Sequence, residues 1–441
     1  MARSGIERRP AGLIRRLAVD LTPLRSSRDF RLLWLGELVS EAGSAIALVA
    51  VFVQVFAITG SAAAVGLIGL VRLAPLMVVA ILGGPLIDRH DRRRLLLIGQ
   101  WGQAAGSTVL LASALIGHPP LALVYVGAAL GAGFGGFALS VRSSMTPNLV
   151  TAEQLPSALV LNQAMWQTCM IAGPAIGGVL IAEFGLSVAY GVDVASFGAT
   201  IAACMLMSAQ VPTSGSESQE LEARAGALGA VRTGWAQITE GFRFLRGRRV
   251  LQSTFYVDLI AMIFGMPRAL FTVLAVTQFH SGPELVGTLW SAVSVGALAG
   301  ALSAGWVRHV RRQGLAVLWA VALWGAGIVA FGLAGNQLVL ALGFLAVAGA
   351  ADVVSAVFRG TILQTTVPDS LRGRMSAVHV LVVVGGPNLG DVEAGVVASA
   401  FTPTVSVVAG GVACIAGVVL LALAVPEFAR YVVPDSTAVP G

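Results

Sequence analysis

The sequence predicts an all-α membrane protein whose twelve transmembrane helices form two pseudo-symmetric six-helix bundles. Of the 441 residues, 56% are hydrophobic and only 11% are charged, whereas a soluble globular domain carries about 25% charged residues. Twelve apolar runs reach the length of roughly 20 residues that a helix needs to cross a bilayer. The arginines fall in alternate loops between these runs, and the two halves of the chain resemble each other.

The first six runs form a predicted N-terminal bundle, residues 31–208, which follows a basic arm, residues 1–30. The arm is expected to lie against anionic lipid headgroups. The six runs fall at residues 31–58, 61–84, 95–116, 120–142, 159–182 and 186–208.

The last six runs form a predicted C-terminal bundle, residues 250–425. A polar central linker, residues 209–249, precedes the bundle, and a tail, residues 426–441, follows it. The six runs fall at residues 250–277, 283–306, 315–334, 336–358, 376–400 and 404–425.

The placement of the arginines predicts the sidedness of the chain. All 28 basic residues are arginine, and 26 of them fall in the two tails and in alternate loops, if Arg142 and Arg359 are counted as loop residues. Cytoplasmic loops collect the basic residues, so we expect a multi-pass cell-membrane protein with both termini in the cytoplasm. The basic charge then indicates a lipid bilayer as partner and no nucleic acid.

Metal and cofactor chemistry finds little support in the sequence. The three cysteines lie inside apolar runs, and the five histidines do not cluster with carboxylates or cysteines at metal-ligand spacing. The glycines of residues 131–136 match a dinucleotide fingerprint, but they lie within an apolar run without a preceding strand, which favours close helix packing. Without lysine a phosphate-binding loop of the GxxxxGK type cannot form. We therefore expect no metal and no cofactor, and an ion gradient as the energy source.

Two short motifs recur in the second half of the chain. Arg-His-Asp-Arg-Arg at 89–93 reappears as Arg-His-Val-Arg-Arg at 308–312. Gly-Pro-Ala-Ile-Gly at 173–177 reappears as Gly-Pro-Asn-Leu-Gly at 386–390, at nearly the same offset. Similar offsets in equivalent runs indicate a duplicated six-helix unit, and parallel halves of this kind place a substrate site between them near the middle of the membrane.

The stretch of residues 83–95 is a charged turn between two apolar runs. Asp88 follows one predicted helix, where the helix dipole is negative, and Arg92 opens the next, where it is positive. One interpretation is a basic cytoplasmic loop; the other is that these charges have partners on other helices in contacts that form and break. Val307 replaces Asp88 in the second copy, and we predict that Asp88 approaches the run at 376–400 near Ser376 and latches the halves together.

This stretch carries a family resemblance. Residues 84–93, Gly-Pro-Leu-Ile-Asp-Arg-His-Asp-Arg-Arg, resemble the signature loop between helices 2 and 3 of the major facilitator superfamily, GxxxD(R/K)xGx(R/K). Asp91 stands where the family has glycine, and as an N-cap of the next helix it would be tolerated. The residues carrying this latch-loop resemblance are Gly84, Asp88, Arg89, Arg92 and Arg93.

A second motif resembles the Gly-Pro-x-x-Gly-Gly core of the superfamily's antiporter motif. It consists of Gly173, Pro174, Gly177 and Gly178. Cys169 stands at one position where a glycine is expected upstream.

A finer resemblance covers nearly the whole chain. Residues 142–161, 189–193, 359–364 and 367–375 resemble the branch that holds the enterobactin exporter and macrolide efflux proteins. That resemblance implies proton-driven export of bulky, amphipathic small molecules such as drugs, macrolides, siderophores or other secondary metabolites. The second-half loop residues within it are Arg359, Asp369, Arg372 and Arg374.

Ionisable groups inside the spans are the candidates for transport, because each costs from about 3 to more than 10 kcal/mol at mid-bilayer unless it is paired or hydrated. The candidates are Glu37, Glu41, Arg72, Asp258, Arg268, Asp391 and Glu393.

Glu37 and Glu41 lie one helical turn apart, hence on one face, and Glu41 and Arg72 lie at similar depth. Their pairing is open to two interpretations, a structural ion pair or a proton- or substrate-binding site. For proton coupling the first choice is Glu41 or Glu37 with Arg72, and the second is Asp391.

The other acids are assigned by spacing. Asp258 and Arg268 are too far apart for a helical pair, so each is expected to face another helix or the cavity. Asp391 and Glu393 cannot face the same way, and Asp352 is expected to pair with a loop arginine.

The leading functional hypothesis is a monomeric, proton-coupled exporter that alternates between two access states. Uptake or facilitated diffusion by the same fold remains open. A membrane-embedded enzyme or receptor is a remote alternative, because no nucleophile, base and orienting group converge in the sequence.

Overall fold

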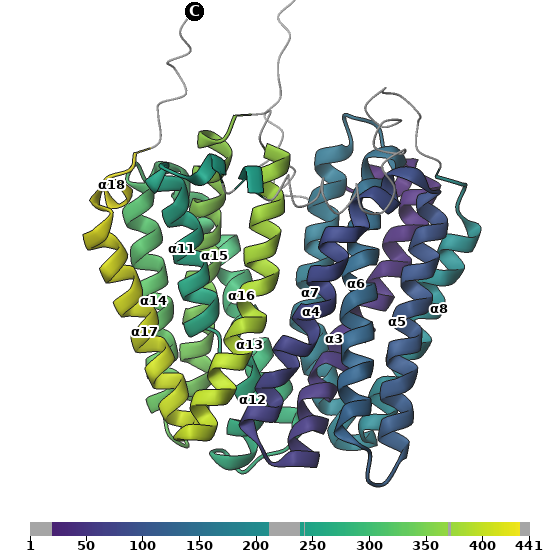
Figure 1. The fold of residues 1–441 in the computed structure, drawn as a ribbon, viewed down its shortest axis with the longest axis horizontal. Coiled ribbons are helices and arrows are strands. Elements are labelled where there is room, and N and C mark those ends of the chain that lie inside the picture. Colours follow the sequence, from purple (N-terminus) through teal and green to yellow (C-terminus); the bar gives the residue numbers. More distant parts are fainter. Residues whose placement is uncertain (1–19, 211–238, 242, 369–371, 433–441) are drawn as a thin grey trace, which may run out of the picture.

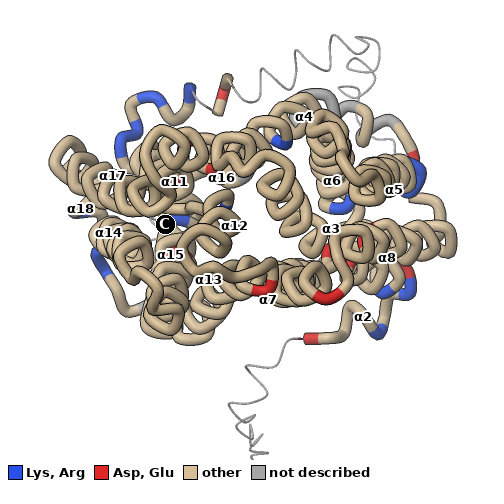
Figure 2. Tube along the Cα trace, turned by 90° about the horizontal axis from the view of Figure 1, so that it is seen from below, with Lys and Arg blue, Asp and Glu red and all other residues tan. Residues whose placement is uncertain are grey.

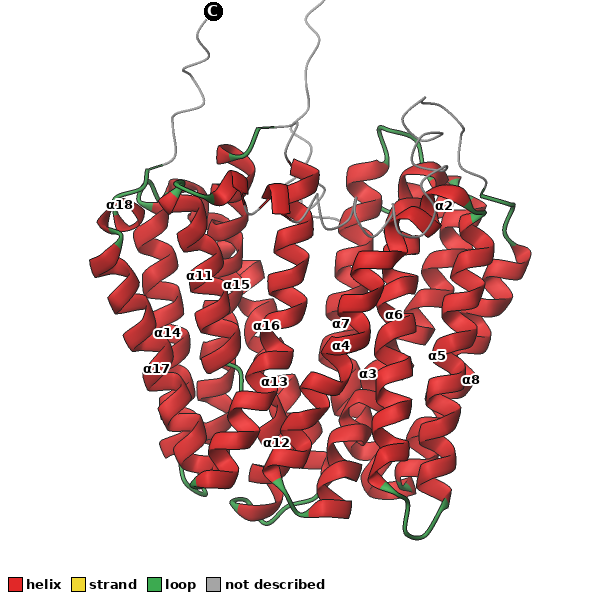
Figure 3. Ribbon diagram, in the orientation of Figure 1, coloured by secondary structure: helices red, strands yellow, loops and turns green. Residues whose placement is uncertain are grey.

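The computed structural model describes residues 20–210, 239–241, 243–368 and 372–432, with parts of α4 and α16 described by backbone alone. Every regular element in these ranges is a helix (Figure 3). Two six-span halves stand side by side (Figure 1).

The N-terminal half consists of a short helix and six long ones. They are α2 (Thr22–Ser26), α3 (Arg28–Thr59), α4 (Ala62–Arg89), α5 (Arg92–Leu115), α6 (Leu121–Leu149), α7 (Leu155–Phe184) and α8 (Leu186–Leu206). The C-terminal half follows the same plan with one span divided. Its helices are α11 (Arg249–Phe264), α12 (Arg268–Thr277), α13 (Pro283–Ser303), η1 (Ala304–His309), α14 (Gln313–Leu333), α15 (Leu338–Thr366), α16 (Arg372–Ala400), α17 (Pro403–Ala424) and α18 (Pro426–Ala429).

The number of spans agrees with the sequence. Among the described residues, 11 segments are long and apolar enough to cross a membrane, with Arg249–Thr277 counted as one. The 29-residue helix α16 runs alongside them as the twelfth (Figure 1). The predicted twelve-helix fold is confirmed.

Several helices extend beyond their apolar runs. α6 continues to Leu149 and α15 to Thr366, so the assignment of Arg142 and Arg359 to loops was wrong. The apolar length reports the hydrocarbon thickness, whereas a helix continues while its charged side chains find partners inside the bundle. α4 likewise continues to Arg89, which leaves only a short turn before α5.

The predicted single span at 250–277 is broken. α11 ends at Phe264 and α12 begins at Arg268, directly after Pro267. Proline lacks the N–H that would continue the helical ladder. Trp324 Nε1 donates a hydrogen bond of 2.6 Å to the carbonyl of Gly265, so the broken backbone is partly satisfied from α14.

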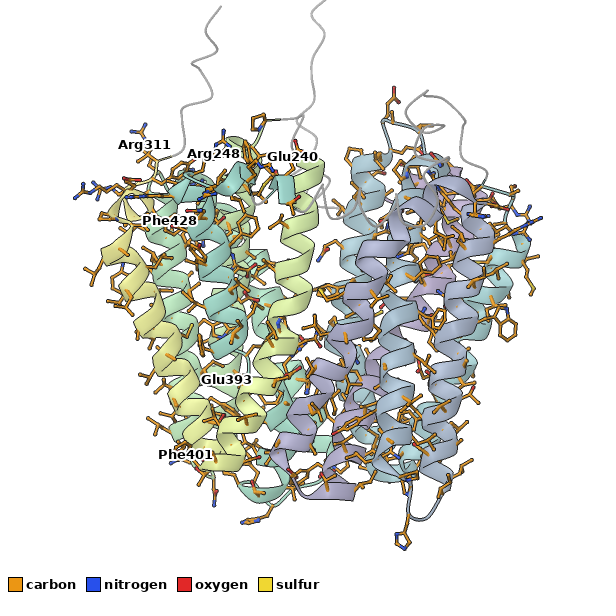
Figure 4. The ribbon with its side chains drawn as sticks, in the orientation of Figure 1. Glu240, Arg248, Arg311, Glu393, Phe401 and Phe428 are labelled. Carbon is orange, nitrogen blue, oxygen red and sulfur yellow. The ribbon has the colours of Figure 1, made fainter. Side chains whose placement is uncertain are left out.

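The molecule has two distinct faces. Helices α2 and α18 lie at one end of the bundle (Figure 3), and so do the side chains of Arg248 and Arg311 (Figure 4). We call this end the arginine-bearing face. Phe401, after α16, lies at the opposite end, here called the far face. Seen along the bundle, many charged residues lie at the periphery, while a few acids and arginines lie on inner helices (Figure 2).

The halves touch most closely toward the far face, through glycines. Gly66 and Gly69 of α4 lie directly against the backbone of α16, where a Cβ on Gly69 would overlap the carbonyl oxygen of Asn388. On the other side Gly178 of α7 lies against α13, where a Cβ on Gly287 would overlap the carbonyl oxygen of Pro174. Small residues permit this backbone approach, so the far face is closed in this conformation.

Substituting Gly69→Val tests this closure. The added side chain would collide with the backbone at Asn388, so α4 and α16 would separate at the far face. The distance between spin labels at Ile58→Cys and Phe401→Cys, measured by pulsed electron paramagnetic resonance, is expected to increase. Gly191→Val, where nothing lies within 4 Å of the added Cβ, is the control, and equal distances in both variants would contradict the closure.

Candidate transport site

A cavity of about 620 Å³ lies between the two halves. This volume is in the range of small-molecule sites. Apolar side chains, among them Phe52, Met77 and Trp166, form part of its wall. Its charged lining residues are Glu37, Glu41, Arg72, Arg142, Asp193, Arg268 and Asp391.

The first group of charges is centred on Arg142 of α6. Its Nη1 lies 2.6 Å from Oε2 of Glu37 and 3.1 Å from Oε1 of Glu41, both on α3. Gln100 of α5 donates a further hydrogen bond of 3.1 Å to Glu37. The Glu37 side chain is 5% exposed and that of Glu41 27%. One guanidinium therefore serves two carboxylates, of which one is sealed and the other reaches the cavity.

The expected pairing of Glu41 or Glu37 with Arg72 was wrong. Both glutamates contact Arg142, and among the described residues Arg72 has no carboxylate within the 4 Å of an ion pair. Equal depth along two helices does not determine how each helix is rotated about its axis. The side chain of Arg142 takes the place that the sequence suggested for Arg72, and both arginines line the cavity.

Asp193 of α8 is a functional candidate that the sequence reasoning missed. It is buried and accepts hydrogen bonds from the hydroxyls of Ser107 on α5 and Ser44 on α3, the latter at 3.2 Å. No arginine or histidine nitrogen within the described chain forms an ion pair with it. An acid in the middle of the apolar run 186–208 was the available signal, because a carboxylate at that depth is costly unless it is paired or hydrated.

The second group of charges lies where the halves meet. Arg268 Nη2, at the start of α12, lies 2.7 Å from Oδ2 of Asp391 on α16. The backbone N–H of Ala269 donates a 3.2 Å hydrogen bond to Oδ1 of the same carboxylate. Asp391 therefore caps α12 from another helix. The guanidinium of Arg268 also lies 5.9 Å from the ring centre of Trp290.

The prediction that Asp391 and Glu393 face different directions is confirmed. Asp391 lines the cavity and is buried, whereas Glu393 is partly exposed and is absent from the cavity wall. Figure 4 labels Glu393 on α16.

The C-terminal half repeats the first group of charges. Arg359 Nη1 on α15 lies 2.8 Å from Oδ1 of Asp258 on α11, and its Nη2 lies 3.7 Å from Oδ1 of Asp352. Nη1 of Arg359 makes no hydrogen bond among the described residues, so its contact with Asp258 is an ion pair without hydrogen-bond geometry. Asp352 thus pairs with an arginine that had been assigned to a loop but lies inside a span. None of the three residues lines the large cavity.

The two charge groups are related by the duplication. The same offset along the chain separates Arg142 from Arg359 and Glu41 from Asp258. This offset falls between the offsets of the two repeated motifs. An arginine of the fourth span that binds an acid of the first span is therefore a feature of the repeated unit.

The arginines that open α5 have partners on other helices. Arg92 Nη1 donates to the carbonyl of Ser144 at 3.1 Å, and Arg93 donates to the carbonyls of Cys204 at 2.6 Å and Met205 at 2.8 Å. Arg93 thereby binds the negative end of the α8 dipole, which explains a positive charge at the start of α5. Asp91 is the N-cap, as expected, because it accepts from the N–H of Arg93 at 3.0 Å.

The proposed latch stays a prediction. Gly84, Asp88, Arg89, Arg372, Arg374 and Ser376 are described by backbone alone, and Asp369 lies outside the described residues. The contacts of Arg92 and Arg93 all lie within the N-terminal half.

The residues of the antiporter-like motif pack α7 against two neighbours. Gly173 lies against Ala45 and Gly177 against Ile46, both on α3. Gly178 contacts α13 of the other half, and Pro174 lies inside α7. The motif therefore sits at a contact between halves near the far face.

Outside the spans, Asp20 ties the start of the described chain to α7. It accepts hydrogen bonds from the N–H of Thr22 at 3.0 Å, from the Thr22 hydroxyl at 2.5 Å and from the Ser157 hydroxyl at 2.9 Å. These donors, those of Thr22 foremost, hold the pKa of Asp20 below its ordinary value of 3.8.

Twelve spans in two related halves, with a charged cavity between them, define a transporter of the major facilitator type. More specifically, the chain belongs to the transmembrane secretion effector family, whose sequence profile matches residues 18–438.

Curated relatives extend over the same length. Enterobactin exporter EntS of Shigella boydii serotype 18 is 27% identical over 415 residues, 94% of this chain and 95% of that protein. The exporter of the same name from Citrobacter koseri is 26% identical over the same shares.

Solved structures share the fold. A mutant of the peptide transporter POT matches with a TM-score of 0.72 at 13% identity, covering 92% of this chain and 96% of that one. A bacterial homologue of the iron transporter ferroportin, in an inward-facing state, matches with a TM-score of 0.66 at 15% identity, covering 91% and 98%.

Removing the cation of the first charge group is expected to destabilise the protein. Arg142→Gln leaves Glu37 charged and buried, and breaking a buried pair costs about 3–5 kcal/mol, so the apparent Tm of the purified protein should fall. The double variant Arg142→Gln with Glu37→Gln should recover much of the loss. Arg94→Gln, whose side chain is 84% exposed, is the control, and an unchanged Tm in Arg142→Gln would contradict the role of the bridge.

Proposed function

We propose that the protein is a secondary active exporter of amphipathic small molecules, driven by protons that move in the opposite direction. The observation that carries this proposal is the cavity of about 620 Å³ with Glu37, Glu41 and Arg142 in its wall. The cavity has room for a small molecule, and the carboxylates in its wall can take up a proton.

The charge balance around Arg142 supports proton coupling. Two carboxylates share one guanidinium, so the fully ionised group carries one excess negative charge among apolar side chains. Binding one proton removes that excess, and the partly exposed Glu41 is the site that protons and water reach first. Asp193, held by two hydroxyls rather than a cation, is a second acceptor on the same side of the cavity.

Sidedness and direction are part of the proposal. The arginine-bearing face is assigned to the cytoplasm by the positive-inside rule. The glycine contacts close the far face, so this conformation is the inward-facing one. The relatives' name, enterobactin exporter, supports outward transport of a small molecule, and rocking of the halves about the cavity supplies the alternating access.

Uptake or facilitated diffusion is the competing function, because the same fold supports it. Substrate accumulation separates the two, since loss of an exporter raises the internal concentration and loss of an importer lowers it. The protein is proposed to work as a monomer in the cell membrane, with substrate, protons and lipid as its partners.

Efflux of a panel of fluorescent amphipathic compounds from cells that express the protein tests this function. A potential of 100 mV contributes about 2.3 kcal/mol per charge, enough for roughly a 50-fold gradient. A protonophore is therefore expected to abolish efflux against a concentration gradient, and Glu41→Gln is expected to do the same.

Glu427→Gln, whose side chain is 64% exposed, serves as the control. Export that persists unchanged after collapse of the proton gradient would overturn the antiport mechanism. Export that persists in Glu41→Gln with normal proton dependence would move the coupling site elsewhere.

A further inference from the structure

We propose that Arg72 is the anion-binding group of the cavity, and that the substrate is an amphipathic anion. Its acidic group would bind Arg72, and its apolar part would lie in a second, apolar cavity that adjoins the first. This inference rests on the proposed transport function, for which it specifies the class of substrate.

Among the described residues, no carboxylate forms an ion pair with Arg72. Its charged neighbours are the guanidinium of Arg268 and the carboxylate of Asp391. Each oxygen of Asp391 already accepts one donor, Oδ2 from Arg268 at 2.7 Å and Oδ1 from the N–H of Ala269 at 3.2 Å. Two guanidinium groups thus share one carboxylate, so the group carries one excess positive charge.

Arg72 is partly exposed in the wall of the cavity. A charge at this depth is stable only when it is paired or hydrated, so a cavity arginine without a carboxylate in an ion pair favours an anionic ligand. Arginine binds carboxylate, phosphate or sulfonate groups through two parallel hydrogen bonds. Arg72 lies on α4 in the N-terminal half, and Arg268 lies on α12 in the C-terminal half. A bound anion would therefore contact both halves.

The acids of the cavity do not cancel this charge. Glu37 and Glu41 on α3 are bound to Arg142, and Asp193 on α8 is bound to two serine hydroxyls. The cavity therefore has an excess of negative charge on α3 and α8 and an excess of positive charge at α4 and α12. An anion at Arg72 and a proton at the acids would occupy different places.

A second cavity of about 310 Å³ lies between α4, α11 and α16. Leu73, Phe255, Tyr256 and Val382 are among its mostly apolar lining residues. Met77 of α4 lines both cavities, and Leu73 directly follows Arg72 in the chain. A molecule held by its acidic group at Arg72 thus has an apolar space one helical turn away, bounded by an adaptable methionine.

Three probes with one aromatic body test the charge of the ligand. They are pyrenebutyrate, its neutral methyl ester, and pyrenylbutyl-trimethylammonium, titrated into the full-length protein in detergent while pyrene fluorescence is recorded. The anion is expected to bind about tenfold more tightly than the ester, a typical worth of one charge-assisted contact. Equal affinities, or a preference for the cation, would overturn the proposal.

Three variants assign the two parts of the site. Arg72→Gln should weaken binding of the anion about tenfold and leave the ester unchanged, while Arg72→Lys, which keeps the charge, should retain the preference for the anion. Leu73→Trp, which fills the apolar cavity, should weaken the anion and the ester by the same factor. An Arg72→Gln protein that elutes normally on size exclusion and keeps the preference for the anion would refute the role of Arg72.

Arg311→Gln is the matched control, because Arg311 is exposed at the arginine-bearing face (Figure 4), away from both cavities. These measurements need neither a proton gradient nor a transport direction. Charge-selective binding without proton-dependent efflux would therefore leave the anion site standing and reject antiport, and the reverse result would reject the anion site alone.

Discussion

The contact of Arg142 with Glu37 and Glu41 is the interaction on which the N-terminal half depends. A lone carboxylate at the depth of Glu37 would be unstable among apolar side chains, and the guanidinium on α6 makes its position on α3 possible. Gln100 on α5 completes the arrangement. These polar side chains would find no other partner in lipid, so their contacts fix three helices relative to one another. The wall of the cavity includes residues of all three helices.

The sequence was sufficient for the features that depend on chain length and periodicity. Apolar runs of bilayer length predicted the twelve spans, the arginine pattern distinguished the two faces, and the repeated motifs indicated the duplication. The N-cap role of Asp91 could be predicted because an aspartate directly before a helix is a typical N-cap, and the structure confirms it. The charged stretch at 83–95 could be interpreted in two ways. Its Arg92 and Arg93 do have partners on other helices, and the role of Asp88 stays a prediction.

The sequence was not sufficient for features that depend on how helices are rotated about their axes. Arg72 and Glu41 lie at similar depth, yet Glu41 contacts Arg142. Arg142 ended one apolar run and Arg359 followed another, and both were assigned to loops, because hydropathy cannot show that a charge is neutralised inside a bundle. Pro267 was a signal for the break before Arg268, but the presence of a proline does not show whether a helix is kinked or interrupted.

The interruption of the seventh span separates α12 from α11 and leaves α12 attached to α16. Between Phe264 and Arg268 the helix is discontinuous, while Asp391 of α16 holds the first turn of α12 by two contacts. The short helix α12 is thus joined to the eleventh span by side chains and to the seventh by a short length of backbone. A shift of α16 would therefore be transmitted through Asp391 to the first turn of α12, where Arg268 lines the cavity.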